Sequence, residues 1–317
     1  MAVLVTGVGY IGAKLVEKLL ERGEEVVAVD NFFSTDARVV NSFRKHKGFR
    51  LVKGSVTNAK VLRSAFSSAD ISTVYSLAAQ ASANPQAATA RYTENTNLLG
   101  PRLLLDHMRE FGVSKMVFAS SFKVYGSALP QVVTEDVPYG SFGDLSHLSK
   151  CYAEKLMEMY SSRYGLTCLP VRLGIVYGIS PVTKLDYRFM TAPNKFCLQA
   201  VRGEEIELHP GAHLPSGLIH IADAAEIMLQ ASDQASFSGY MPINAVTETR
   251  SVAQIADYVA VAAERRGLNV SIRFLDESAD TSRGYDVVVR SAFESLFEQP
   301  RRKLQDTVGE MIDYFRA

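Results

Sequence analysis

The sequence lacks tryptophan, and it has only three cysteines among 317 residues. Cys151, Cys168 and Cys197 are dispersed and odd in number, a pattern that fits neither a disulfide framework nor a metal site. We therefore expect reduced thiols and no bound metal. An excess of charge of one sign is also lacking, because 34 basic side chains balance 34 acidic ones. This balance argues against nucleic acid or an anionic membrane surface as the main partner.

Long hydrophobic runs are missing as well, and none reaches the length that would span a bilayer. The first residues already have the pattern of a core strand, so the sequence predicts no signal or transit peptide and a cytoplasmic protein. Repeats and low-complexity segments are not evident. The length allows one large domain or two closely joined ones, with an ample hydrophobic core.

The most specific pattern in the chain lies in residues 1–30. A short apolar segment there predicts a buried parallel strand, and Gly7-Val8-Gly9-Tyr10-Ile11-Gly12 follows it at once. Helical spacing of apolar residues comes next, and a second apolar strand ends at Asp30. Strand, glycine turn, helix, strand and acid together are the dinucleotide-binding fingerprint in its required context.

Each glycine of this turn has its own physical reason. Gly7 permits the tight turn, Gly9 lets a pyrophosphate approach the backbone, and Gly12 lets the helix pack close to the strand. The start of the helix offers unpaired N–H groups and the positive end of the helix dipole. We therefore expect Tyr10 and Ile11 to bind the cofactor together with the three glycines.

Asp30 indicates which dinucleotide is bound. A carboxylate at the end of the second strand can bind both ribose hydroxyls of NAD, and it would repel a 2′-phosphate. Asn31 and Phe32 follow, and neither offers a cation for such a phosphate. The sequence therefore favours NAD over NADP, with Asp30 and Asn31 at the adenosine end.

The rest of the first half continues the alternation of strands and helices. Apolar segments predict strands at residues 49–52, 72–77 and 114–119, and helical spacing predicts helices at 58–66 and 87–111. This alternation implies an α/β fold with a parallel, doubly wound sheet. The fourth strand runs into Leu77, Ala78, Ala79 and Gln80, at the carboxyl end where ligands lie in such sheets.

Three motifs together resemble those of the extended short-chain dehydrogenase/reductases. They are the glycine turn, the segment Val117-Phe118-Ala119-Ser120-Ser121-Phe122-Lys123-Val124-Tyr125-Gly126, and Ser149-Lys150-Cys151-Tyr152-Ala153-Glu154-Lys155. Within that class the chain is most similar to the NAD-dependent nucleotide-sugar epimerase/dehydratase family. Shorter matching stretches at 97–100, 171–172, 177–178 and 219–223 extend the likeness over nearly the whole chain.

The resemblance implies a division of the chain. A Rossmann-type NAD-binding domain would comprise residues 1–172, joined by about 217–246, with residues 219–221 returning to the main sheet. A smaller α/β substrate-binding domain would comprise residues 173–216 and 247–317. In this family the long helix after the fourth strand and the helix at 145–160 pair two subunits, so the resemblance also implies a homodimer.

The resemblance assigns a catalytic set with one member replaced. In this family a Ser or Thr, a Tyr and a Lys act together, and the Tyr exchanges a proton with a sugar hydroxyl while the Lys lowers the pKa of that Tyr and binds the nicotinamide ribose. Ser121 and Lys150 match the Ser and Lys positions. Ser146 stands one helical turn before Lys150, where the family has Tyr. A serine hydroxyl is less acidic than a phenol and reaches less far.

Three explanations for this replacement stay open. Another group can serve as the acid/base, the candidates being His147, Tyr125, Tyr139, Tyr152 or a water held by Ser146. The chemistry can need no such proton transfer, or the protein can bind NAD without turnover. Histidine is a common acid/base residue, but the place of His147 beside residue 146 on the helix turns it in another direction and favours a structural role.

The resemblance also implies the ligand-binding residues. Besides the glycine turn, Asp30 and Asn31, the cofactor would contact Leu77, Ala78, Ala79, Asn97 and Lys150. The substrate would contact Gln80, Lys123, Tyr125, Asn194, Lys195 and Arg283. Lys195 and Arg283 are the candidates for a clamp on a diphosphate, since Ile175 and Ser216 stand where the family often has diphosphate-binding residues.

The sequence therefore predicts an NAD-dependent enzyme that epimerises a nucleotide sugar through a transient keto intermediate, with an atypical acid/base arrangement. Two alternatives remain at this point. One is an NAD-dependent dehydrogenase or reductase of a sugar or specialised metabolite, for which the weakened diphosphate grip argues. The other is a catalytically reduced NAD-binding protein, for which Ser146 argues.

Overall fold

A computed structural model describes residues 1–183, 185–275, 285–297 and 301–317. Its centre is a seven-stranded parallel sheet in the order β11-β7-β5-β4-β1-β2-β3. The strands are β1 (Ala2–Thr6), β2 (Glu25–Asp30), β3 (Phe49–Lys53), β4 (Ile71–Ser76), β5 (Lys115–Ser121), β7 (Thr167–Leu173) and β11 (Ile243–Ala245). The order reverses between β1 and β4, which confirms the predicted doubly wound Rossmann-type fold.

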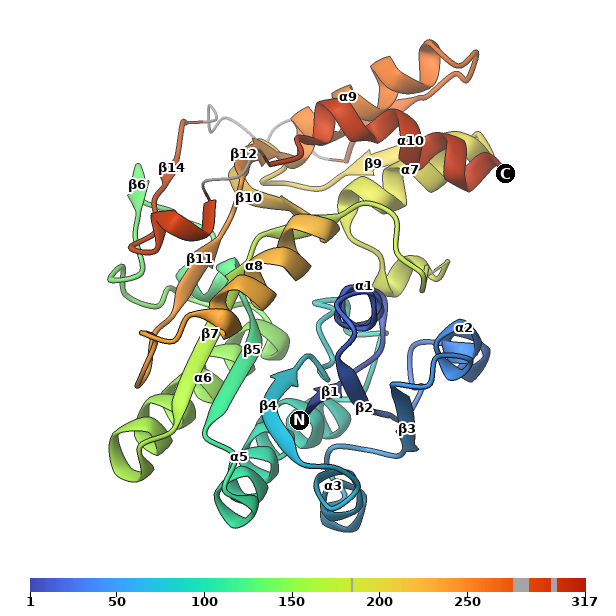
Figure 1. Ribbon diagram of the computed structural model, residues 1–317. Coiled ribbons are helices and arrows are strands. Elements are labelled where there is room, and N and C mark those ends of the chain that lie inside the picture. The colour runs from blue at the N-terminus through green and yellow to red at the C-terminus, as the bar shows by residue number, and fades with distance from the viewer. Residues whose placement is uncertain (184, 276–284, 298–300) are drawn as a thin grey trace.

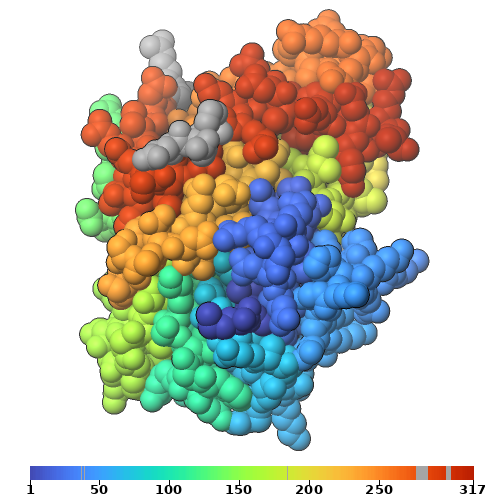
Figure 2. Space-filling view, in the orientation of Figure 1, coloured from blue at the N-terminus to red at the C-terminus, as the bar shows by residue number. Residues whose placement is uncertain are grey.

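Helices cover both faces of this sheet. On one face lie α1 (Tyr10–Glu21) and α8 (Ile221–Asp233), which Figure 2 shows side by side, and Lys18 and Glu226 pair across them at 3.1 Å. On the other face lie α3 (Ala59–Phe66), α5 (Gly100–Phe111) and α6 (Leu145–Tyr164) (Figure 1). Along β1, Val3 packs in the first layer and Leu4 in the second, because successive strand residues face opposite sides.

The helix expected over residues 87–111 is divided in the structure. Thr89 caps α4 (Ala90–Glu94), and the π-helical turn η2 (Asn95–Leu99) follows before α5 begins at Gly100. A Cβ at residue 100 would lie 2.9 Å from a methyl group of Val56, so glycine lets the helix pass close to the segment that follows β3. The wide turn directs Asn97 toward the end of β4, which connects this irregularity to the ligand cleft.

The second half adds a smaller group of elements at one end of the molecule. Helices α7 (Ala192–Arg202), α9 (Val252–Glu264) and α10 (Leu304–Arg316) gather there around their own hydrophobic cluster (Figure 1). A three-stranded sheet joins β12 (Glu248–Ser251), β10 (Pro215–His220) and β8 (Ile175–Tyr177), and β9 (Ile206–Leu208) pairs with β13 (Ile272–Phe274).

One strand expectation is wrong. Residues 219–221 do not return to the main sheet, because β10 ends at His220 and pairs with β8 and β12 instead. The place beside β7 is taken by β11. Both segments are short and apolar, so the sequence pattern does not distinguish them.

The remaining elements are short. They are η1 (Ala37–Val40), α2 (Asn41–Arg44), η3 (Phe122–Tyr125), β6 (Val132–Val133), η4 (Tyr187–Phe189), β14 (Val288–Val289) and η5 (Glu294–Phe297). Across the described ranges, no helix is both long enough and apolar enough to traverse a bilayer.

Candidate active site

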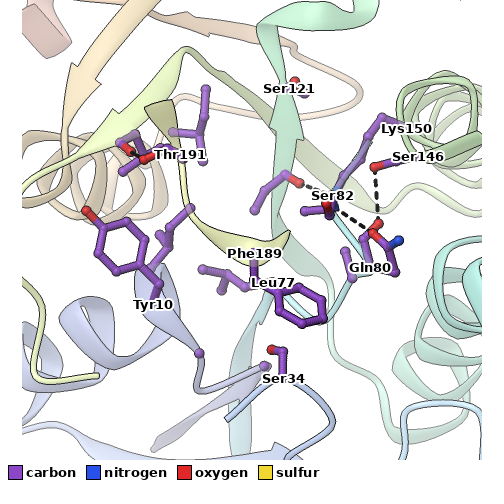
Figure 3. A pocket seen from close by; sticks show the side chains of 18 of the residues that line it. Tyr10, Ser34, Leu77, Gln80, Ser82, Ser121, Ser146, Lys150, Phe189 and Thr191 are labelled. Atoms are coloured by element: carbon purple, nitrogen blue, oxygen red, sulfur yellow. Dashed lines mark hydrogen bonds between the residues drawn. The ribbon is translucent and has the colours of Figure 1, made fainter. Parts of the chain in front are cut away.

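A cleft of about 520 Å³ opens along the carboxyl ends of the parallel strands, a volume in the range of small-molecule sites. The ends of β1, β2, β4 and β5 form its floor, and the segments 173–176, 188–192 and 215–217 close it from the second half of the chain. Figure 3 shows Tyr10 and Thr191 on one side of this cleft and Ser146 and Lys150 on the other. The cleft therefore joins the glycine turn to the predicted catalytic residues.

The glycine turn is built by close backbone contacts. Gly7 has a positive φ of 82°, and a Cβ there would lie 2.6 Å from the backbone nitrogen of Ala78. A Cβ at Gly12 would lie 1.8 Å from the Gly7 carbonyl oxygen, so the helix can pack only with glycine at this position. At Gly9, in contrast, a Cβ would meet nothing within 4 Å. Gly9 therefore faces the open cleft, as a phosphate-contacting glycine requires.

The start of α1 and the end of β2 fit the two ends of an adenosine diphosphate. The N-cap of α1 is Gly9 and no side chain caps the helix, so its first N–H groups are left for a ligand. Asp30 lines the cleft, and its two carboxylate oxygens each accept a backbone N–H at 2.6 Å, from Val8 and from Phe32. These bonds hold the carboxylate at the end of β2, where the sequence predicts that the adenosine ribose binds.

The predicted catalytic residues come from β5 and α6. Ser121 ends β5, and its Oγ accepts the N–H of Lys123 at 3.2 Å. Lys150 is buried, and its Nζ donates to the Ala119 carbonyl at 2.6 Å and lies 4.6 Å from the centre of the Phe118 ring. Burial lowers the pKa of Lys150 to about 8, although the Glu154 carboxylate opposes this shift.

Ser146 lies in the cleft one turn before Lys150, as the helical spacing predicts. Its Oγ donates to the Gln80 carbonyl at 3.1 Å (Figure 3). Gln80 is held in turn by Asn97, which accepts the Gln80 N–H and donates to the Gln80 carbonyl, both at 2.8 Å. Asn97 also donates to Ser149 on α6 at 2.9 Å, so it is a residue that positions the cleft wall and does not line it.

A buried ionic network holds β5, β7 and α6 in register. Glu154 of α6 is fully buried and accepts two guanidinium N–H groups of Arg172 on β7, the closest at 2.7 Å. Ser120 of β5 also donates to Glu154, and the hydroxyls of Tyr139 and Tyr240 donate to it at 3.0 Å each. Because buried charges need such partners, this network fixes Ser121 and Lys150 relative to each other.

Of the four side chains considered as alternative acid/base groups, His147 lines the cleft and the three tyrosines do not. Tyr125 is buried, with its hydroxyl bonded to Asn244 and Arg172, and Tyr139 is bonded to Glu154, so neither lines the cleft. Tyr152 is 45% exposed on the outer face of α6. His147 does line the cleft, and its Nδ1 lies 2.5 Å from Asp144 Oδ2. The direction of His147 on the helix suggested a structural role. The structure nevertheless places this residue on the wall of the cleft.

Most of the predicted ligand-binding residues lie on the wall of this cleft. They are Gly7, Gly9, Tyr10, Ile11, Gly12, Asp30, Asn31, Leu77, Ala78, Ala79, Gln80, Ser121, Lys123, Ser146 and Lys150. Tyr125, Asn194 and Lys195 do not line it. The Asn194 amide is engaged by both backbone groups of Gly178, and the Lys195 ammonium lies over the Tyr187 ring at 5.8 Å. Arg283 lies outside the described residues.

The sequence did not indicate several residues that the cleft brings in. Phe33 and Tyr92 stack with their ring centres 3.9 Å apart beyond Asp30, at the adenosine end. Ser82 donates to the Arg188 carbonyl and so joins the end of β4 to the second half of the chain. Each of these contacts is made between distant segments, so no local sequence pattern could have signalled it.

This fold and cleft define a dinucleotide-dependent enzyme of the short-chain dehydrogenase/reductase class. Residues 3–241 match the model of the NAD dependent epimerase/dehydratase family, and the chain belongs to that family, with NAD as its cofactor. The predicted family and cofactor are thereby confirmed.

Several known proteins are similar to the chain. A UDP-glucose 4-epimerase of Erwinia amylovora is 29% identical over 261 residues, covering 77% of this chain and 77% of that protein. A UDP-glucuronate 4-epimerase of Thermodesulfobacterium geofontis is 33% identical over 186 residues, covering 55% of this chain and 56% of that protein. The crystal structure of the Thermus thermophilus UDP-glucose 4-epimerase in complex with NAD superposes with a TM-score of 0.81 and 26% identity, covering 100% of this chain and 99% of that one.

The open space at Gly9 predicts a variant that separates folding from cofactor binding. Gly9→Ala should leave the melting temperature of the cofactor-free protein unchanged, because the added methyl meets no protein atom. It should weaken NAD binding about tenfold or more, because the pyrophosphate could no longer approach the backbone. Calorimetric titration with NAD and thermal unfolding measure the two effects.

Two control variants belong with this prediction. Gly7→Ala should lower both stability and affinity, because its Cβ would collide with Ala78. Gly23→Ala also forces a side chain into positive φ, but in open space and outside the cleft, so it should affect stability alone. Unchanged NAD affinity in Gly9→Ala would contradict the proposed position of the pyrophosphate.

The lowered pKa of Lys150 predicts a pH dependence of cofactor binding. A lysine whose folded pKa is about 8 carries its charge below that pH and loses it as the pH rises through it. The affinity for NAD should therefore fall between about pH 7 and about pH 9, because the ammonium that is predicted to bind the nicotinamide ribose loses its charge. Lys150→Met should bind NAD more weakly and without this fall. A wild-type affinity that stays constant over this interval would contradict the assignment.

Proposed function

We propose that this chain is an epimerase of a nucleotide sugar that works through a transient keto sugar. The observation that carries the proposal is the single cleft that joins the glycine turn and Asp30 to Ser121 and Lys150. The names of the similar proteins, which are 4-epimerases of UDP-glucose and UDP-glucuronate, support the same reaction class. NAD, when bound, supplies the acceptor and donor of hydride.

The chain's own groups would act around the reacting sugar oxygen. We assign the Ser121 hydroxyl to hydrogen-bond that oxygen, and the Lys150 ammonium to hold the nicotinamide ribose and to supply positive charge. Ser146 occupies the place of the family's phenol, and its hydrogen bond to Gln80 keeps the cleft wall in position. Its short side chain leaves the proton transfer to another group.

We propose that His147 carries out this proton transfer. Asp144 caps α6 by accepting the His147 N–H at 3.0 Å, and its other oxygen faces Nδ1 of the same residue at 2.5 Å. With Nδ1–H donated to the carboxylate, Nε2 is the ring nitrogen that can accept a proton. The hydrogen bonds from His147 hold the pKa of Asp144 below its usual range, against the effect of burial, so the partner stays ionised.

The direct test of function uses NAD-loaded protein and a panel of UDP-, GDP- and dTDP-sugars. An epimerase converts one of them to its epimer, seen by NMR, with only a transient rise in the absorbance of reduced cofactor. A simple dehydrogenase, the alternative that the neutral Ile175 and Ser216 in the cleft support, accumulates NADH in proportion to substrate. A protein that neither reduces NAD nor changes any sugar would contradict both.

Substitution of His147 should slow the chemical step. His147→Asn should lower kcat about 100-fold, while KM changes little. His209→Asn, an exposed histidine outside the cleft, is the control. A kcat for His147→Asn equal to that of the wild type would contradict the assignment. Ser146→Tyr provides a further comparison, because a large gain would indicate a decayed enzyme and a loss would indicate that serine suits its own chemistry.

We also propose a homodimer that pairs through α5 and α6. Leu148, Tyr152 and Met159 of α6 are 51%, 45% and 46% exposed, and their spacing places them on one helical face. The double variant Leu148→Glu with Tyr152→Glu should convert the dimer to a monomer in light-scattering measurements, because it places charges in an apolar contact. Val261→Glu on α9, equally exposed, should leave the dimer intact. A wild-type monomer would contradict the proposal.

A further inference from the structure

Lys123 stands close to the proposed reacting centre. Its backbone N–H donates to Ser121 Oγ at 3.2 Å. This hydrogen bond caps the turn η3, which follows β5. Lys123 lines the cleft, as do Ser121, Ser146 and His147. Lys123 therefore belongs to the sugar end of the cleft and lies far from the adenosine end at Asp30.

In the part of the chain that the structure describes, the ammonium of Lys123 carries a positive charge that no protein group compensates by direct contact. Burial lowers the pKa of Lys123, and the charge of Asp144, whose carboxylate is already bonded to His147, opposes this shift. Within the described parts of the chain, no hydrogen bond or ion pair is formed by the Lys123 ammonium. Lys123 is half-buried, and a partly desolvated charge without a partner costs free energy, so its presence beside a cleft points to a ligand that supplies the partner.

The other cations on the wall differ in this respect. The Lys150 ammonium donates to the Ala119 carbonyl, and the Arg188 guanidinium pairs with Asp186 at 2.6 Å. Of the cleft residues that the structure describes, Asp30 alone has a carboxylate, and it lies at the opposite end. The sugar end of the cleft therefore has an excess of positive charge to which Lys123 contributes a group available for binding.

We propose that Lys123 binds an anionic substituent of the sugar ring, a carboxylate, so that the cleft prefers a nucleotide uronic acid to a neutral nucleotide hexose. This inference rests on the proposed binding of a nucleotide sugar. A carboxylate beside Lys123 would complete the missing charge-assisted hydrogen bond, and a hydroxymethyl group in the same place would leave the ammonium without a counter-charge. The cleft would then discriminate against a neutral sugar because that sugar provides no counter-charge for the Lys123 ammonium.

The test compares three probes by calorimetry on the NAD-loaded protein: UDP, UDP-glucose and UDP-glucuronate. Wild type should bind UDP-glucuronate about ten- to 100-fold more tightly than UDP-glucose. Lys123→Met should remove this difference by weakening UDP-glucuronate alone, and Lys123→Arg should retain most of it. Lys60→Met, which removes an exposed lysine of α3 outside the cleft, should leave all three affinities unchanged.

Other outcomes would overturn the proposal. Equal weakening of all three probes in Lys123→Met would place the ammonium on the diphosphate, and failure of wild type to bind UDP-glucuronate, or to prefer it, would remove the carboxylate site. Thermal unfolding of Lys123→Met should show no loss of stability, since the variant removes an uncompensated charge. If UDP-glucuronate binds through Lys123 without being epimerised, the proposed carboxylate site is supported and the proposed epimerisation is contradicted. If UDP-glucose is epimerised and UDP-glucuronate is not preferred, epimerisation is supported and the carboxylate site is contradicted.

Discussion

The close backbone approach at Gly7 is the constraint on which the cleft depends. A Cβ at this residue would lie 2.6 Å from the Ala78 nitrogen, so the ends of β1 and β4 meet only because glycine is there. These two strands flank the point where the strand order reverses, and ligands of doubly wound sheets bind at that point. The same contact directs α1 toward the cleft and keeps the Gly9 backbone exposed to it.

A second constraint fixes the opposite wall. Glu154 is a fully buried carboxylate that receives bonds from β5, from β7 and from two tyrosine hydroxyls. Removing Arg172 would leave the Glu154 charge uncompensated in the core, and removing a hydroxyl would take away a hydrogen-bond donor, so these partners hold α6 against β5 and β7. Lys150 lies one turn before Glu154 on the same helix, and its ammonium is therefore held near Ser121. Ser146, at the position where we expect the family's tyrosine, takes no part in this network, because its hydroxyl donates to the Gln80 carbonyl.

Much of the cofactor half of the cleft could be predicted from the sequence. The glycine turn, Asp30 and residues 77–80 are specified by local backbone geometry, which a sequence pattern records directly. Tyr125 and Asn194 could not be placed in this way, because their partners, Asn244 and Gly178, are brought to them only by the folded chain. The same reason applies to the Phe33–Tyr92 stack and to the exchange of β10 for β11 in the main sheet. For His147, the direction of the side chain on the helix could be predicted. That the cleft extends as far as this residue could not.

The most direct test of the account is a crystal structure of the protein with bound NAD. The account predicts the pyrophosphate on the backbone N–H groups that follow Gly9, the adenosine ribose on Asp30, and the nicotinamide ribose on the ammonium of Lys150. The reactive carbon of the nicotinamide should then face the hydroxyl of Ser121 and the imidazole of His147. A dinucleotide bound elsewhere, or one whose nicotinamide turns away from Ser121 and Lys150, would contradict the central claim.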